Sequence, residues 1–226
     1  MGIGGVAGNG QDELLAALSG EMKTPTDMVA VSGQGVGHLS PNARRSIGLC
    51  AAPEERNGHA AAPDMSLTEN ALMTGATRMN LASGNGILNW GKARDFAQSI
   101  IQSFDVRTPS TETAARALSG GNLQKFVIGR EILQKPKVLI VNQPTWGVDA
   151  SAAAAIRQAL LDLAASGSAV VVISQDLDEL IEITDRFAAL NEGKLTAPVE
   201  TARLSMEQIG LMLGGAHDAE VAHVDA

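Results

Sequence analysis

The stretch LSGGNLQKFVIGREILQKPKVLIVN, residues 118–142, places a glycine-rich turn, a helix and a strand one after another. Ser119 stands directly before the helical pattern, where a hydroxyl can accept a hydrogen bond from a free backbone N–H group. Residues 137–142, KVLIVN, do not alternate polar with apolar side chains, which is typical of a strand buried on both faces of a parallel sheet. A helix that leads into such a strand predicts an α/β fold.

The alternation of helix and strand continues beyond this stretch. Residues 149–166 place Ile156, Leu160 and Leu163 at helical spacing, and residues 169–174, AVVVIS, predict a second buried strand. By the same patterns we expect five further helices: near residues 14–18, after the Ser40 cap and Pro41, at about 66–74, at about 90–104 and at 176–185. We also expect strands near residues 28–35 and 186–190.

The composition limits the classes of function. Of the 226 residues, 45% are hydrophobic and 19% are charged, which is typical of a folded globular chain. The formal net charge of −8 disfavours nucleic acid as the main partner, because binding phosphates requires a basic surface. No apolar run reaches the ~20 residues that cross a bilayer, so we expect no direct membrane insertion. The single cysteine, Cys50, is expected to be a small core residue in a reducing compartment.

Four segments with distinctive residues follow one another along the chain: GVAGNGQD (5–12), LSGGN (118–122), LIVNQPTWGVD (139–149) and VISQD (172–176). Their order and spacing resemble the nucleotide-binding domain of an ATP-binding-cassette (ABC) transporter over nearly the whole chain. The strings GVAGNGQ, PEERNG, LSGGNLQK and QPTWGVD are similar to the second, C-terminal cassette of the tandem ATP-binding subunits that serve simple-sugar and nucleoside importers.

This resemblance implies a P-loop NTPase fold of the α/β class, with a central, mostly parallel sheet and a helical signature subdomain. It implies one nucleotide-binding domain over residues 1–215, with the helical subdomain at roughly 60–130 and a disordered acidic tail at 216–226. In the family, a buried strand leads into the first glycine-rich segment, whereas only Met1 to Gly4 precede that segment here. We therefore expect the N-terminal strands to be truncated or supplied by another chain.

The first glycine-rich segment is expected to be a degenerate phosphate loop. Glycines let successive backbone N–H groups converge on phosphate oxygens at a helix N-terminus. A competent loop adds a lysine for the β- and γ-phosphates and a Ser or Thr for Mg²⁺, but the matching positions here hold Gln11 and Asp12. On their own, the glycines are equally compatible with an ordinary turn. The resemblance assigns nucleotide contacts to Gly5, Gly8, Asn9, Gly10, Gln11 and Asp12.

The residues Leu118 to Asn122 match the signature motif of the family without a change. By resemblance this motif acts in trans. The Ser119 hydroxyl, the N–H groups of Gly120 and Gly121 and the helix N-terminus close over the γ-phosphate of a nucleotide that a partner cassette holds. Asp149 is also intact and is assigned to the partner's site. The alternative is a flexible turn in which Ser119 or Asn122 caps the following helix.

The strand that ends at Asn142 delivers amides where the family has carboxylates. By resemblance, Asn142 replaces an Asp that orders Mg²⁺, and Gln143 replaces a Glu that polarises the attacking water. Gln175 stands where a His senses the γ-phosphate, and Pro53 and Glu54 fall near a metal-sensing Gln. Because each replacement removes a charge or a proton-transfer group, we expect no intact catalytic residue and no metal ligand at this chain's own site.

The function that the resemblance implies is the ATP-binding component of an importer for simple sugars or nucleosides. ATP and Mg²⁺ would bind at a composite site with another cassette, fused or separate, and permease subunits would dock on residues 65–104. The chain would lie in the cytoplasm, on the inner face of the plasma membrane. Two alternatives stay open: a nucleotide-binding or interaction module without a share in hydrolysis, and a truncated fragment of a tandem-cassette ATPase.

Other conspicuous residues have structural explanations. Arg44 and Arg45 are expected to form a solvated helix face. Trp146 falls in the segment that borders the cassette dimer by resemblance, but it is equally compatible with interior packing. The histidines show no metal-ligand spacing and are expected on the surface: His38, His59, His217 and His223.

Overall fold

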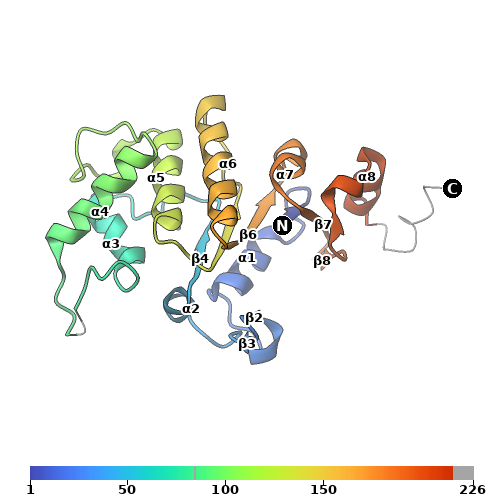
Figure 1. Cartoon of the computed structure of the whole chain (residues 1–226), viewed down its shortest axis with the longest axis horizontal. Helices are drawn as coiled ribbons and strands as arrows, with labels where there is room; N and C mark the ends of the chain where they lie inside the picture. The colour runs from blue at the N-terminus through green and yellow to red at the C-terminus, as the bar shows by residue number, and fades with distance from the viewer. Residues whose placement is uncertain (84, 216–226) are drawn as a thin grey trace.

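The computed structural model describes residues 1–83 and 85–215 and places a mostly parallel sheet at the centre of the molecule (Figure 1). The sheet order is β4-β5-β6-β1-β7-β8, and β9 also pairs with β7. The first five of these strands run parallel, whereas β8 and β9 run antiparallel to β7. The strands are β1 (Gly2–Gly4), β4 (Leu49–Ala52), β5 (Val138–Asn142), β6 (Ala169–Ser174), β7 (Arg186–Asn191), β8 (Lys194–Leu195) and β9 (Val199–Glu200).

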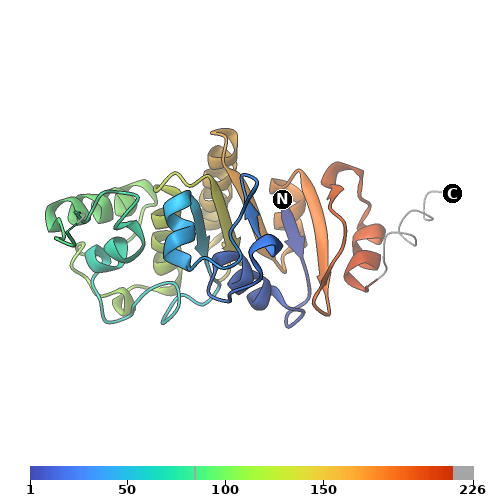
Figure 2. The same ribbon diagram turned by 90° about the horizontal axis from the view of Figure 1, so that it is seen from below.

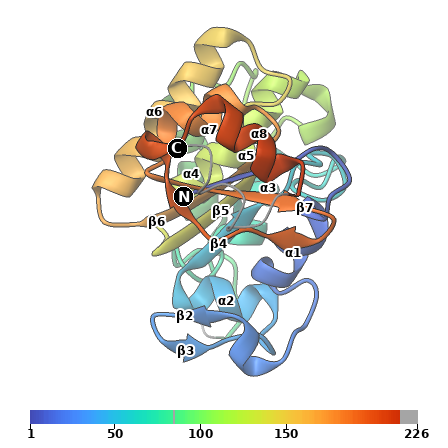
Figure 3. The same cartoon turned by 90° about the vertical axis from the view of Figure 1, so that its right-hand side faces the viewer.

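Helices cover both faces of this sheet (Figure 3). One face carries α1 (Gln11–Ser19), α2 (Pro41–Ile47) and a small hairpin of β2 (Ala30–Val31) and β3 (Gln34–Gly35). The opposite face carries α5 (Gly120–Ile132), α6 (Ala150–Ala165), α7 (Leu177–Ile183) and α8 (Met206–Leu213). The α/β fold with a mostly parallel sheet is therefore confirmed.

Strand β5 shows why its sequence does not alternate. Leu139 and Val141 belong to the larger hydrophobic cluster, which also contains the buried side chains of α5 and α6. Ile140 belongs to the second cluster, together with Leu15 of α1, and Val138 packs against that cluster. Because successive side chains point to opposite faces, a strand with helices on both sides needs apolar residues throughout.

Strand β1 leads directly into the glycine-rich loop and lies between β6 and β7 in the middle of the sheet. The strand that feeds the loop is therefore present in this chain with three residues, which corrects the expectation that another chain supplies it. The strand was hard to recognise because two of its three residues are glycines. A Cβ at Gly4 would come 2.7 Å from the ring of Phe187, and one at Gly2 would come 2.8 Å from Oγ1 of Thr184, so close packing explains both glycines.

Three helices gather at one end of the molecule, where α3 (Leu67–Gly75), α4 (Trp90–Ser103) and α5 pack against one another (Figures 1 and 2). Ser66 caps α3 in a capping box with Glu69, and Asn89 caps α4. The helices predicted at 66–74 and 90–104 are confirmed to within a residue or two. The buried residues of these helices share one continuous cluster with β4 and β5, and α5 packs against β4.

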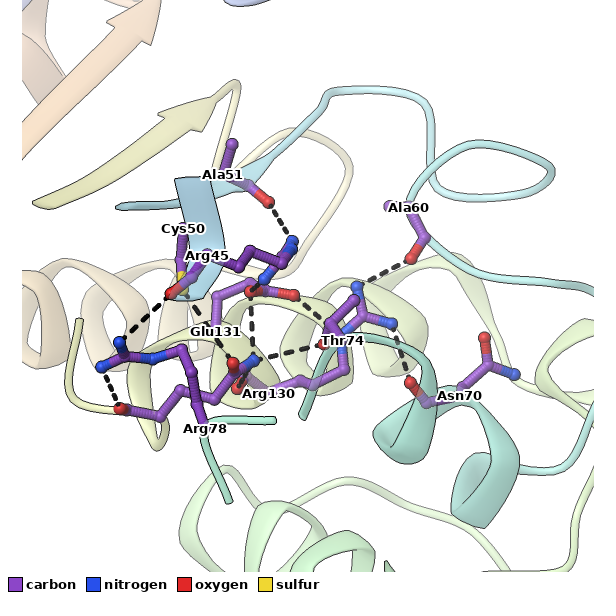
Figure 4. A network of polar contacts seen from close by, with 10 residues as sticks. Arg45, Cys50, Ala51, Ala60, Asn70, Thr74, Arg78, Arg130 and Glu131 are labelled. Carbon is purple, nitrogen blue, oxygen red and sulfur yellow. Dashed lines mark hydrogen bonds and ion pairs between the residues drawn. The ribbon is translucent and has the colours of Figure 1, made fainter. Parts of the chain in front are cut away.

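A buried ionic network joins this helical end to the sheet (Figure 4). Glu131 of α5 is fully buried and accepts hydrogen bonds from Arg45 of α2 and, at 2.9 Å, from Nε of Arg130. Arg130 is also buried and donates to the carbonyls of Ala60 and Asn70. Burial alone would raise the pKa of Glu131, but Arg45 and then Arg130 outweigh burial and hold that pKa below its ordinary value.

The prediction that Arg44 and Arg45 face solvent is wrong: Arg45 belongs to the Glu131 network, and Arg44 is buried at a separate junction. Arg44 is 0% exposed and donates from Nη1 to the carbonyls of Ala17 and Leu18, at 2.6 and 2.7 Å, and from Nη2 to that of Gly37 at 2.8 Å. Those first two carbonyls lie in the last turn of α1, which has no intrahelical donors for them. Arg44 therefore ties the end of α1 to α2.

Other predictions meet the structure as follows. The capping of α2 by Ser40, with Pro41 at the first helical position, is confirmed. Strand β4, which contains the fully buried Cys50, and helix α8 were not predicted. The tail at 216–226, with two of the four histidines, lies outside the described residues. In the described part of the chain, no helix is long and apolar enough to cross a membrane.

Candidate functional site

The polar segments identified in the sequence meet at one edge of the sheet. The loop after β1, the amides after β5 and Gln175 after β6 all follow parallel strands that are neighbours in the sheet. The carboxyl ends of parallel strands share an edge, and ligands of open α/β sheets bind there. The structure therefore brings together most of the residues that sequence analysis assigned to the chain's own nucleotide site.

The loop itself has the backbone shape that its glycines predict. Gly8 and Gly10 have φ angles of +84° and +108°, which side chains with a Cβ rarely adopt. Asn9 holds the loop against the turn between β7 and β8: its Oδ1 accepts from the N–H of Glu192 at 2.8 Å, and its carbonyl accepts from that of Gly193 at 2.9 Å.

Gln11 occupies the interior of this loop. It is 8% exposed, its Nε2 donates to the carbonyl of Val6 at 2.8 Å, and its Oε1 accepts from the N–H of Asn9 at 3.1 Å. A phosphate would have to compete with this side chain for the Asn9 amide. The loop thus holds a neutral amide where a triphosphate site requires a cation.

Asp12 and Asn142 are joined by a side-chain hydrogen bond beside the loop. Asn142 is 1% exposed and donates from Nδ2 to Oδ1 of Asp12 at 3.1 Å. The carboxylate of this pair lies on helix α1 and the amide on strand β5. Asn142 Oδ1 is buried and has no partner among the described residues. The first turn of α1 also carries Glu13, so two acidic residues already complement the positive end of the helix dipole, and they repel an added phosphate.

Gln143 and Gln175 lie side by side, as expected for two positions of one site. The buried Gln143 adopts a left-handed φ of +51°, and its Oε1 accepts from the Ser174 hydroxyl at 3.3 Å and from the N–H of Gln175 at 3.5 Å. Both glutamines line a pocket of about 250 Å³ together with Trp146. The side chain of Gln143 is therefore already hydrogen-bonded within the protein.

A buried carboxyl group near Gln143 and Gln175 was not predicted from the sequence. Glu179 is 2% exposed, and its Oε2 accepts from the Ser174 hydroxyl at 3.0 Å. Burial raises the pKa of Glu179, and hydrogen bonds from Thr145 and Ser174 oppose that shift. Glu179 was hidden because it lies in the first turn of α7, where an acidic residue is also expected for helix stability.

A larger pocket of about 840 Å³ opens between α1 and the segment after β4. Asp12 and Glu54 both line it, so Glu54 lies beside the loop, as expected for a residue near the metal-sensing position. Burial raises the pKa of Glu54, and the nearby charge of Asp12 raises it further. The described residues contain no cluster of three or more His, Cys, Asp or Glu side chains that could hold a metal ion.

The signature segment lies at the exposed N-terminus of α5. Ser119 is the N-cap of this helix, and its Oγ accepts from the N–H of Asn122 at 3.4 Å and from its side-chain amide at 2.9 Å. Ser119 and Gly120 are exposed, whereas Leu118 packs against the core. The helix N-terminus, the hydroxyl and the glycine amides fit a phosphate group that approaches from outside.

Behind the signature, α5 is tied to the end of β5. Gln124 is 1% exposed and donates to the carbonyls of Gln143 and Pro144 at 3.3 and 2.8 Å. Its Oε1 accepts from Nε of Arg56 at 2.9 Å. Arg56 was not predicted to have a role, because an arginine in a loop rich in Pro and Gly gives no local signal in the sequence.

The segment after Gln143 reaches the surface beside the signature. Trp146 is 64% exposed, so interior packing does not explain it. Asp149 caps α6, accepting from the N–H of Ala152 at 2.9 Å and from the Ser151 hydroxyl at 2.7 Å. The hydrogen bond from Ala152, and then the one from Ser151, hold the pKa of Asp149 below its ordinary value.

Comparison with known proteins agrees with this geometry. A family described as "ABC transporter" matches residues 1–146. The glucose import ATP-binding protein TsgD13 of Haloferax volcanii is 38% identical over 221 residues, which are 97% of this chain and 40% of that protein. The guanosine import ATP-binding protein NupO of Bacillus subtilis is 36% identical over 220 residues, 97% of this chain and 43% of that protein. The chain thus spans about two fifths of the length of these relatives.

Solved structures of cassettes share the fold. A dimeric structure of a bacterial ABC transporter cassette superimposes with a TM-score of 0.74 at 20% identity, covering 88% of this chain and 84% of that one. A nucleotide-free cassette of an ABC transporter gives a TM-score of 0.69 at 20% identity, covering 100% of this chain and 87% of that one.

Proposed function

Because the chain belongs to the ABC transporter family, we propose that it is an ATP-binding cassette of an importer in which its own nucleotide site does not hydrolyse ATP. Its signature face completes the site of a partner cassette, which binds ATP and Mg²⁺. The single observation that carries this proposal is the contrast between the two regions. Gln11, Asn142 and Gln143 are each buried and hydrogen-bonded within the protein, whereas Ser119 stands exposed at the start of α5.

The chemistry of this chain's own nucleotide site supports this division of roles between the two cassettes. Orienting Mg²⁺ needs a carboxylate at the end of the strand, and activating water needs a base beside it. Asn142 carries no charge, and Gln143 cannot accept a proton from water. The residues at this site therefore do not fit a hydrolysed Mg²⁺-nucleotide.

The names of the relatives support a class of cargo. Similar proteins include import ATP-binding proteins named for glucose, guanosine, nucleosides and ribose, which supports a simple sugar or a nucleoside as the cargo. On this proposal, permease subunits dock on residues 65–104, which contain α3 and α4, within a helical subdomain at roughly 60–130. The cassette then works in the cytoplasm, on the inner face of the plasma membrane.

The proposal is tested by measuring ATP turnover for the chain alone and for the chain paired with the intact cassette of its transporter. We expect no turnover alone and turnover in the pair. Ser119→Ala in this chain should abolish the turnover of the pair, whereas Gln143→Ala should leave it within about twofold. Brisk turnover by the chain alone that Gln143→Ala removes would refute the division of roles. A pair that is insensitive to Ser119→Ala would favour the alternative of a binding module without a share in hydrolysis.

A further inference from the structure

The guanidinium of Arg56 lies against the signature segment. Arg56 follows β4, and its Nε donates to Gln124 in the first two turns of α5, while its Nη2 donates to the carbonyl of Trp146. One side chain therefore bridges the start of the signature helix and the exposed segment after β5. Both segments belong to the face that meets the partner cassette under the proposed function.

Two glycines make room for this guanidinium. A Cβ at Gly120, inside the signature, would come 2.8 Å from Nη1 of Arg56, and a Cβ at Gly147 would come 3.0 Å from Nη2. A side chain at either position would displace the guanidinium. The positive group therefore lies beside the N–H groups at the start of α5, where the helix dipole already favours an anion.

The charge of Arg56 has no carboxylate to balance it directly. Its hydrogen-bond acceptors are an amide and a backbone carbonyl, and among the described residues no carboxylate forms an ion pair with it. Burial lowers the pKa of Arg56, and Glu54 only partly opposes that shift. A partly desolvated cation with neutral acceptors can gain a strong, charge-assisted hydrogen bond when an anion arrives.

Lys125, another cation near the start of α5, is already engaged. Nζ of Lys125 donates to the carbonyl of Asp105 at 2.5 Å and lies 3.5 Å from its carboxylate. Arg56, in contrast, lies close to Gly120 and has only neutral hydrogen-bond acceptors in the described part of the chain.

We propose that Arg56 is a phosphate-binding residue of the signature face and contacts the terminal phosphate of a nucleotide held by the partner cassette. This rests on the proposed function and extends it to a residue outside the signature motif. Arg56 would act as a positive charge delivered in trans, where charge on the γ-phosphate must be balanced. The competing explanation is a structural tie in which Arg56 only holds the loop after β4 against α5.

The test measures how tightly this chain associates with the intact partner cassette, in ATP with Mg²⁺ and in ADP with Mg²⁺, together with kcat and KM of the pair. The variants are Arg56→Met, Arg56→Lys, Gln124→Met and Ser119→Ala. Gln124→Met removes the tie but leaves the charge. Arg203→Ala is the control for charge, because Arg203 is exposed and pairs with Glu200 beside β9. Thermal melting of each variant chain establishes that it folds.

We expect Arg56→Met to weaken association in ATP by about tenfold or more, with a smaller loss for Arg56→Lys and no change in ADP. Gln124→Met and Arg203→Ala should each stay within about threefold of the wild type. Equal losses for Gln124→Met and Arg56→Met would overturn the proposal in favour of a structural tie. If Ser119→Ala weakens association in ATP and Arg56→Met does not, the Arg56 inference alone fails. If Ser119→Ala has no effect, the proposed function fails, and the inference fails with it.

Discussion

At the scale of single residues, this chain's own nucleotide site is defined by side chains that hydrogen-bond within the protein. Gln11 bonds to both ends of its loop, Asn142 bonds to Asp12, and Gln143 bonds to Ser174. Each of these contacts is made by a group that a competent cassette leaves for its ligand. Most polar groups of the site are therefore engaged within the protein, with Asn142 Oδ1 as an exception, which explains how the sequence tolerates the loss of several charged groups at once.

The occupation of the loop by Gln11 leads to a direct prediction. Gln11→Lys should raise the affinity of the isolated chain for ATP by about tenfold, because it supplies a cation for a charge-assisted hydrogen bond and frees the Asn9 amide. It should not create turnover, since Asn142 and Gln143 remain. Isothermal titration with ATP measures the affinity. Gln158→Lys in the exposed part of α6 adds the same charge away from the loop and should change affinity by less than twofold.

The residues of the site were predictable to the extent that they belong to a linear motif. Asn142, Gln143, Gln175 and the loop glycines were identified from the sequence and do meet at one edge of the sheet. Arg56 and Glu179 were not identified, because their importance depends on contacts with α5 and β6 that only the folded chain creates. Arg44 was misjudged for the same reason: its acceptors are carbonyls of a helix more than twenty residues earlier.

At the scale of elements, the junctions between helices depend on buried charge. Arg44→Ala should lower the free energy of unfolding by about 3 kcal/mol, since it leaves the last carbonyls of α1 without donors and opens a cavity. Urea denaturation measures the loss. Arg203→Ala, which removes an exposed arginine, should cost less than about 0.5 kcal/mol. An Arg44→Ala protein as stable as the wild type would mean that water replaces the guanidinium.

The Glu131 network predicts a dependence on pH. At pH 7, Glu131→Gln should destabilise the fold by about 3 kcal/mol, because it leaves Arg45 and Arg130 without a counter-charge. The pKa of Glu131 is lowered in the folded state, so its contribution is fully present above the ordinary value of 4.5 and is lost as the pH falls through the folded value. The difference in stability between wild type and Glu131→Gln should therefore shrink below about pH 4.5. As a control at pH 7, Glu200→Gln at an exposed ion pair should cost less than about 0.5 kcal/mol.

Element positions were predictable where apolar spacing and caps coincide, as in α2, α3, α5 and α6. Strand β1 was not recognised, because glycine gives no hydrophobic signal and its place in the sheet depends on Phe187 and Thr184. Strand β4 was missed because Ala51 and Ala52 suit a helix as well as a strand, and only pairing with β5 decides between them.

At the scale of the whole molecule, one hydrophobic cluster extends from α4 through the sheet to α8. We expect the helical end and the sheet to unfold together. Cys50 reports on this, because it is 0% exposed and burial raises the pKa of its thiol to about 11, which leaves almost no reactive thiolate at neutral pH. Thiol labelling and far-UV circular dichroism should follow the same urea transition. Labelling at clearly lower urea would show that β4 opens on its own.

The exposed position of Trp146 has an optical consequence. The chain has two tryptophans and no tyrosine, and both tryptophans are partly exposed to water, Trp90 at 46% and Trp146 at 64%. Fluorescence excited in the near ultraviolet therefore comes from these two tryptophans alone, and the Trp90→Phe variant keeps only one of them. In that single-indole protein, a blue shift on mixing would time the arrival of a second cassette in a stopped-flow instrument, without any attached dye.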